Sequence, residues 1–127
     1  MSNARRLFGQ DFNLLTPGQA RFLIDLAEIP MNATKQLTAR GHRCGIERHS
    51  DGHLSGYVHL PSGIDADVEG LSTAETQVVR HGDKLEFDCN LELDYVPLNL
   101  EPQPHASYKD SKHVRAELTR IVNRLAS

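Results

Sequence analysis

The chain has 127 residues, 39% of them hydrophobic and 24% charged, and a formal net charge of −3. This composition is typical of a folded protein and excludes a largely disordered one, so we expect a single α+β domain over residues 1–127, with 1–14 as the candidate flexible segment. No apolar run approaches the roughly 20 residues of a membrane helix. A net acidic chain is not typical of proteins that neutralise phosphates, so nucleic acid is not an expected partner.

The first predicted element is a helix over residues 15–29. Thr16 and Gln19 match a T-x-x-Q capping box, and Pro17 suits the first helical position. Pro30 ends the element, because the residue before a proline avoids helical backbone geometry. Local sequence signals therefore define both ends of this helix.

The next segments predict a short helix and then two hairpins. Residues 32–41 read as a short helix with Asn32 as its cap and Gly41 as its stop. Further along, an Asp-Gly pair at 51–52 and a Gly-Asp pair at 82–83 are hairpin-turn signals. Two tandem hairpins favour an antiparallel sheet of four to five strands. The expected strands are residues 42–49, 53–60, 76–81 and 84–89, and the expected loops are residues 61–75 and 98–106.

The last predicted element is a long helix over residues 107–127. Ser107 and Asp110 form a capping pair at its start. Its apolar residues recur at helical spacing, which predicts that one stripe of the helix packs on one face of the sheet. The stripe consists of Val114, Leu118, Ile121, Val122 and Leu125.

Residues 84–95 alternate between apolar and polar side chains, which predicts one long strand with one solvated face. The alternation places Cys89 on the apolar side. A buried thiol has a raised pKa and is unreactive, so we interpret Cys89 as a core residue rather than a nucleophile. The only other cysteine is Cys44, and two such residues do not make a disulfide framework. We therefore expect a reduced, cytoplasmic protein.

The same alternation gathers polar side chains on one sheet face. Histidine, tyrosine and carboxylate together are the composition of a metal site or an acid–base site, but a solvated face or a charged sheet edge explains the same pattern. No HExxH, GxSxG or P-loop motif is present. The candidate ligand-binding residues are Tyr57, His59, Asp88, Glu86, His53 and Asp94, and the alternative metal set is His49, His53, His59 and Asp88.

Three stretches resemble a group of small phage- and prophage-encoded proteins of unknown function. LSGYVHLP (54–61) resembles an L-C-G-Y-V-x-V-P strand, and FDCNLELDYVP (87–97) resembles a G-F-D-C-x-H-x-x-D strand that leads to a proline. YKDSKHVRAELTRIVNRLA (108–126) is similar to a Y-R-D-x-x-Y-V-x-x-E closing helix. Beside these three, VEGLST (68–73) is a degraded version of a V-H-G-G-L-T segment. The resemblance covers about half the chain and implies an accessory protein of a mobile element.

The chain departs from this group at several polar positions. Ser55 replaces the first cysteine of the group, Glu69 replaces a histidine, and Asn90 or Leu91 replaces the histidine that follows F-D-C. A site that the group builds from those positions is therefore not carried over. The matching positions are Gly56, Tyr57, Val58, Pro61, Phe87, Asp88, Cys89, Asp94, Tyr108, Asp110, Val114 and Glu117.

Three functions are compatible with these observations. The first is a non-enzymatic binding or interaction module of a phage or mobile element, a homo-oligomer with a dimer as first expectation, acting on an unknown small ligand or protein. The second is a small metal-assisted hydrolase that uses the metal set with Glu86 or Glu92. The third is a nucleic-acid-associated protein that uses the basic last helix, although late arginines also suit a helix dipole. No cofactor is predicted.

Overall fold

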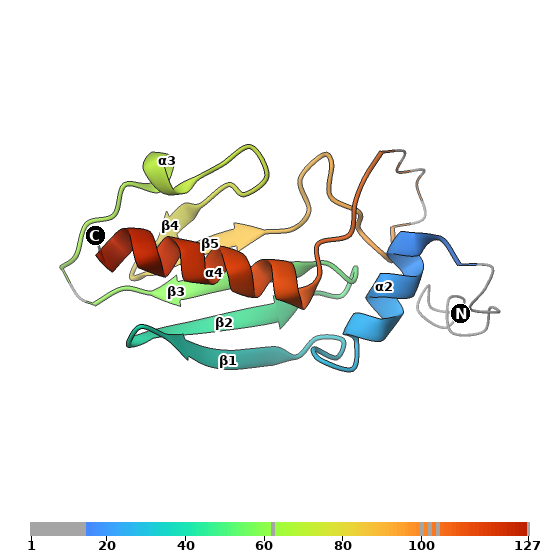
Figure 1. Cartoon of the computed structure of the whole chain (residues 1–127), viewed down its shortest axis with the longest axis horizontal. Helices are drawn as coiled ribbons and strands as arrows, with labels where there is room; N and C mark the ends of the chain where they lie inside the picture. Colours follow the sequence, from blue (N-terminus) through green and yellow to red (C-terminus); the bar gives the residue numbers. More distant parts are fainter. Residues whose placement is uncertain (1–14, 62, 100, 102, 104, 127) are drawn as a thin grey trace.

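The computed structural model describes residues 15–61, 63–99, 101, 103 and 105–126. Five strands form one antiparallel sheet in the order β1-β2-β3-β5-β4, and α4 packs on one of its faces (Figure 1). This architecture confirms the predicted α+β class. The candidate flexible segment 1–14 lies outside the described residues. The elements are α2 (Pro17–Asp25), β1 (Thr34–Ala39), β2 (His42–Arg48), β3 (Leu54–His59), α3 (Val68–Leu71), β4 (Val79–His81), β5 (Lys84–Asp88) and α4 (Ser111–Ala126).

Both predicted hairpins are present. β2 pairs with β3 across the turn at 49–53, and β4 pairs with β5 across a turn in which Gly82 has a φ of 61°. The second hairpin joins the first through β5, which pairs with β3. The β4 strand is consequently an edge strand, and it is shorter than predicted because only residues 79–81 pair.

The helix predicted at residues 32–41 is wrong, because this segment contains strand β1. Arg40 and Gly41 both have positive φ angles, 48° and 81°, and reverse the chain so that β1 pairs with β2 along its whole length. Leu37 and Ala39 pack against the main core from this strand. Pairing with a neighbouring strand has overridden the local helix signals.

The long strand predicted at residues 84–95 ends at Asp88. Beyond it, the carboxylate of Asp94 accepts a hydrogen bond from the backbone N–H of Leu91 and closes a turn. This turn leaves Leu93 65% exposed and Asp94 only 5% exposed, the reverse of what unbroken alternation predicts. The alternation therefore describes a strand only as far as its first five residues.

The capping box predicted for the first helix is confirmed, since Thr16 and Gln19 bond to each other's backbone N–H groups. That helix ends at Asp25, earlier than predicted. The last helix begins at Ser111 rather than residue 107, because the backbone of Ser107 pairs with residues 93 and 95. Among the described residues, no helix combines the length and the apolar character needed to cross a membrane.

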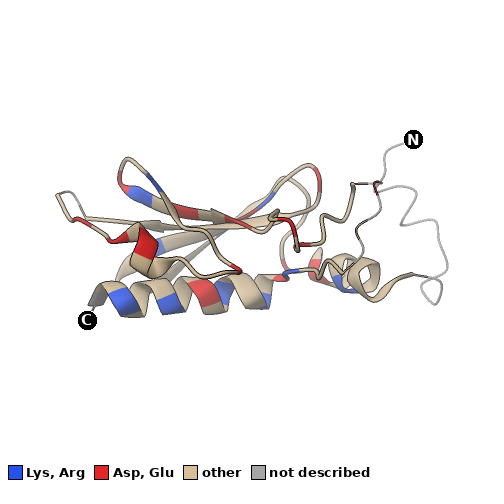
Figure 2. Ribbon diagram, turned by 90° about the horizontal axis from the view of Figure 1, so that it is seen from above, with Lys and Arg blue, Asp and Glu red and all other residues tan. Residues whose placement is uncertain are grey.

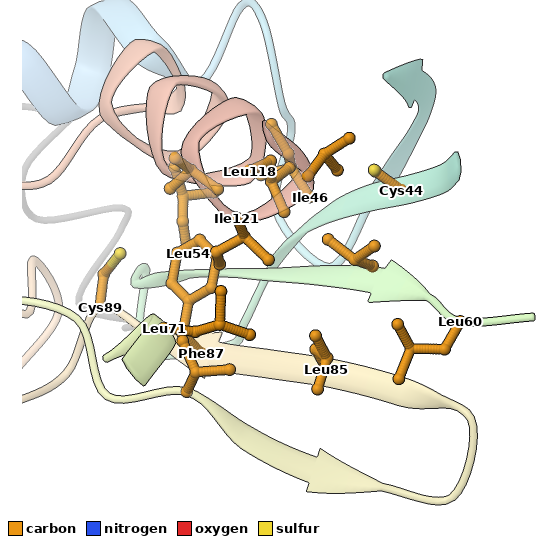
Figure 3. Close-up of a cluster of buried hydrophobic side chains, with 14 of the residues drawn as sticks. Cys44, Ile46, Leu54, Leu60, Leu71, Leu85, Phe87, Cys89, Leu118 and Ile121 are labelled. Carbon is orange, nitrogen blue, oxygen red and sulfur yellow. The ribbon is translucent and has the colours of Figure 1, made fainter. Parts of the chain in front are cut away.

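The main core lies between the sheet and α4 (Figure 3). Leu118 and Ile121 of α4 contact apolar residues from the strands, as the helical stripe predicts. Cys89 is 5% exposed and belongs to this core, which confirms its predicted place. A second, smaller cluster forms around Phe22 and Tyr108 and joins α2 to the start of α4.

Candidate functional site

No helix of the described chain lies across the sheet face opposite α4 (Figure 2). Most of the polar candidates lie on this face, because they alternate along β3 and β5 with the residues of the core. The strand register arranges its side chains in rows that cross the strands. One row contains Ser55 and Asp88, the next contains Tyr57 and Glu86, and the third contains His59 and Lys84. Successive rows are two residues apart along a strand, which corresponds to about 6.8 Å.

The β2–β3 turn brings two histidines together at one end of this face. The backbone N–H of His49 donates to the carbonyl of His53 over 2.9 Å, so the two residues are cross-strand neighbours. Their rings stack with centroids 4.4 Å apart and an interplanar angle of 12°. Buried Arg48 stabilises the turn, because its guanidinium donates a hydrogen bond to the carbonyl of Gly52 over 2.9 Å.

Asp88 reaches this pair from the end of β5, on the far side of β3. Its Oδ1 lies 3.0 Å from Nε2 of His53 and 3.7 Å from Nε2 of His49. One ligand atom from each of the three residues lies within 4.8 Å of the other two. These residues, His49, His53 and Asp88, are called the His–His–Asp cluster below.

A second carboxylate fixes the orientation of His53. Oδ1 of Asp51 lies 2.5 Å from Nδ1 of His53 and also accepts the backbone N–H of His53. Nδ1 therefore donates to Asp51, and Nε2 faces Asp88. Burial works against the charged ring, but the hydrogen bonds with Asp88 and Asp51 outweigh burial and raise the pKa of His53. The bond with His53 in turn lowers the pKa of Asp88 against the effect of burial.

The cluster is open to solvent on one side. The side chains of His49 and Asp88 are 39% and 50% exposed, whereas His53 is 8% exposed. Ser55, in the row beside Asp88, places its hydroxyl 2.7 Å from Nε2 of His49. The arrangement therefore offers two imidazole nitrogens, a carboxylate and a hydroxyl around one solvent-accessible point.

The remaining sequence candidates lie elsewhere. His59 sits at the opposite end of β3, four residues from Ser55 and so about 13 Å along the strand. Tyr57 and Glu86 face each other in the middle row, where Glu86 contacts Nδ1 of His81 at 3.3 Å. Asp94 is buried off this face and lies 3.5 Å from the ammonium of Lys109. The structure thus brings together three of the four residues of the predicted metal set.

Sequence reasoning missed Asp51 and Ser55 as site residues. The Asp-Gly pair predicts Asp51 only as a turn residue, although an aspartate between two histidines that flank a predicted turn is a usable signal. A lone serine such as Ser55 carries no site signal of its own. Its role depends on contact with His49, which the sequence does not indicate.

Comparison of the chain with protein-family models, curated proteins and solved structures finds no match.

Proposed function

We propose that this chain is a binding module that holds a divalent transition-metal ion, of the zinc class, at the His–His–Asp cluster. The observation that carries the proposal is the convergence of His49, His53 and Asp88 within 4.8 Å on an exposed sheet face. Two imidazoles and one carboxylate are ligands that zinc accepts, and three protein ligands are usual where a fourth position remains open to solvent or a bound molecule.

The separations support this proposal. Tetrahedral zinc with bonds of about 2.0–2.1 Å places its ligand atoms about 3.3 Å apart. The Asp88 oxygen lies 3.0 Å and 3.7 Å from the two histidine nitrogens, close to that spacing. Metal-ligating histidines usually donate their other ring N–H to a carboxylate, and Asp51 accepts from Nδ1 of His53 in this manner. The rings of His49 and His53 are stacked with an interplanar angle of 12°, so they must turn for both Nε2 lone pairs to meet at one ion.

The test is metal uptake by the full chain after treatment with a chelator. We expect one zinc or cobalt ion per chain after gel filtration, and a cobalt absorption spectrum of low coordination number. His49→Gln and Asp88→Asn each remove one exposed ligand and should each lower affinity at least about tenfold. His105→Asn is the matched control, because His105 is exposed and its positive φ of 67° is tolerated by asparagine.

Equal metal uptake by wild type and both ligand variants would contradict the proposal, as would a wild type that takes up no metal. In either case the cluster would be an ionic network that fixes the β2–β3 turn. Circular dichroism of each variant separates loss of a ligand from loss of folding.

A metal-assisted hydrolase is a second candidate. It is favoured by the exposed side of the cluster, where an ion held by three ligands would present a bound water to a substrate. The hydroxyl of Ser55 at 2.7 Å from His49 lies beside that position. Turnover of a chromogenic phosphate or carboxylate ester that depends on metal and disappears in Asp88→Asn favours this candidate over simple binding.

The cellular setting and the assembly are further parts of the proposal. Residues 54–61 and 108–126 resemble small phage- and prophage-encoded proteins of unknown function, which supports a cytoplasmic accessory role in a mobile element. A homo-oligomer, with a dimer as first expectation, is supported by strand β1, which forms a six-residue edge of the sheet. Light scattering of the purified chain tests the assembly, and a monomer at all concentrations contradicts it.

A further inference from the structure

A hollow of about 190 Å³ lies on the open sheet face, at the end away from the His–His–Asp cluster. A water molecule occupies about 30 Å³ in the liquid, so the hollow has room for a small polar group and its water. Five side chains that can donate hydrogen bonds line it, from strands β1, β2 and β3. They are Gln36, Thr38, Arg43, Tyr57 and His59.

None of these five donors has a hydrogen-bond or ion-pair partner among the residues that the structure describes. Among the described residues, no side-chain hydrogen bond or ion pair is made by the amide of Gln36, the guanidinium of Arg43 or the ring nitrogens of His59. The hydroxyls of Thr38 and Tyr57 are equally uncommitted in that part of the chain. Convergent donors without protein acceptors favour a ligand that supplies the acceptors.

Tyr57 is built into the floor of the hollow. Its side chain is 8% exposed, and its phenol lies flat on Gly45 of the neighbouring strand. A Cβ atom at position 45 would lie 2.2 Å from Cζ of the ring, so only glycine permits this placement. Tyr57 is therefore more than nine-tenths buried and still lines the hollow, with its hydroxyl held against Gly45.

The charge around the hollow is positive. The guanidinium of Arg43 lines it, and the ammonium of Lys84 lies 4.5 Å from the centroid of the Tyr57 ring on the adjoining strand. Burial, together with the charges of Arg43 and Lys84, lowers the pKa of His59, while Asp83 acts in the opposite direction. Glu47 lies near Tyr57, but no carboxylate from the described part of the chain lines the hollow itself.

We propose that this hollow binds a phosphate group, either as free inorganic phosphate or as the phosphate of an organic ester. The guanidinium of Arg43 provides paired N–H donors that match the oxygens of a phosphate, while the tyrosine and threonine hydroxyls and the glutamine amide add neutral donors. Lys84 contributes long-range attraction. The hollow shares no residue with the proposed metal site, so phosphate binding can be tested independently of metal binding.

The test is a nuclear magnetic resonance titration of the isotope-labelled full chain, with EDTA present so that metal plays no part. The probes are inorganic phosphate, adenosine 5′-monophosphate and adenosine. We expect saturable shifts around the hollow with both phosphate compounds and none there with adenosine. Arg43→Gln should weaken binding at least about tenfold, the usual effect of losing a hydrogen bond to a charged group. Tyr57→Phe should weaken it less.

Arg40→Gln is the matched control. Arg40 is exposed in the β1–β2 turn, so this substitution removes the same charge from a position outside the hollow. It should bind phosphate within about twofold of wild type. Equal affinity for both phosphate compounds assigns recognition to the phosphate alone, and tighter binding of the ester adds a contact with its organic part. The proposal is overturned if neither compound gives saturable shifts at the hollow, if adenosine gives the same shifts there, or if Arg40→Gln is as weak as Arg43→Gln.

Discussion

The guanidinium of Arg48 lies 3.1 Å from the carboxylate of Asp25, and the two side chains are 0% and 8% exposed. The pair joins β2 to α2 behind the β2–β3 turn. Arg48 also donates to the carbonyls of Ile29 and Gly52, and Asp25 accepts from the hydroxyl of Tyr108 and the backbone N–H of Ser111. One buried ionic network thus ties two helices to the turn that carries the histidines.

Arg48→Met should destabilise the protein strongly. The methionine fills part of the volume but leaves the Asp25 carboxylate buried without its cation, and removal of one partner of a buried pair typically costs about 3–5 kcal/mol. The free energy of unfolding from urea titration measures this loss.

Arg21→Gln is the control for Arg48→Met, since Arg21 is 57% exposed in its ion pair with Asp110. An exposed pair typically contributes less than about 1 kcal/mol. Similar losses in the two variants would show that the buried network does not hold the fold together.

The parts of the fold that sequence predicted well depend on local interactions. The capping box of α2 involves residues three apart, and the two hairpins depend on short turns that contain glycine. Strand β1 was missed because its identity depends on pairing with β2, while its own residues carry helix signals. The turn after Asp88 was missed because it depends on Asp94 and on contact with distant Ser107.

In the candidate site, too, local sequence signals predict some contacts, whereas others depend on the whole fold. His49 and His53 are brought together by a turn that the sequence indicates, so their proximity follows from the predicted hairpin. Asp88 joins them only because β5 pairs with β3 rather than lying at the sheet edge. That strand order is a property of the whole fold. His59 has the right chemistry and the right face, but the register places it at the other end of β3.

Gly45→Ala should displace the ring of Tyr57 from the sheet, because the new methyl group would overlap Cζ at 2.2 Å. Overpacking of this kind typically costs about 1–3 kcal/mol. The measurement is urea unfolding of Gly45→Ala in the wild-type and in the Tyr57→Ala background. The penalty should largely disappear in the second background, where no ring meets the methyl group. An equal loss of unfolding free energy in both backgrounds would mean that the alanine perturbs the strand backbone rather than the ring of Tyr57.

Both thiols should be unreactive in the native protein. Burial, with a smaller contribution from Asp94, raises the pKa of Cys89 to about 12, and burial raises the pKa of Cys44. Ellman's reagent at about pH 8 should therefore titrate neither cysteine until urea is added, since the thiolate is the reactive form. Thr119→Cys, on the exposed side of α4, is the positive control for accessibility. A thiol that reacts rapidly in the native wild type would show that Cys89 or Cys44 is not buried in the core.

Glu117 should contribute to stability at neutral pH and lose that contribution in acid. Burial alone raises the pKa of its carboxyl, but hydrogen bonds from Arg120 at 2.8 Å and from Thr76 lower the pKa below its ordinary 4.5. Because the folded-state pKa is lowered, the stabilisation is present above the ordinary value and is lost as the pH falls through the lowered one.

Glu117→Gln tests this expectation. The variant should unfold at lower urea concentration than wild type at about pH 7, and the difference should shrink by about pH 3. Glu92→Gln is the control for loss of one carboxylate, because Glu92 is exposed and makes no hydrogen bond or ion pair within the described chain. A difference between wild type and Glu117→Gln that is constant with pH would mean that the charge of Glu117 does not matter.

Asp51→Asn should weaken metal binding while preserving the turn. The asparagine Oδ1 can still accept the backbone N–H of His53, which Asp51 now does over 3.1 Å, so the hairpin should remain folded. The negative charge that Asp51 directs at Nδ1 of His53 is lost, however, and the imidazole becomes a poorer ligand. Changes in such supporting partners typically cost 10–100-fold in metal affinity, and we expect about tenfold because a hydrogen bond remains possible.

The measurement for Asp51→Asn is competition for zinc against a chelating dye. Asp65→Asn serves as the control, because Asp65 is fully exposed and its contact with Arg80 spans 3.9 Å. If Asp51→Asn and wild type bind zinc equally while His49→Gln binds more weakly, then Asp51 only shapes the turn. If all the variants bind zinc alike, the ion does not occupy the His–His–Asp cluster, because His49→Gln removes one of its ligands. The Asp51 carboxylate acts through the ring of His53, so it can influence only a metal that Nε2 of that ring contacts.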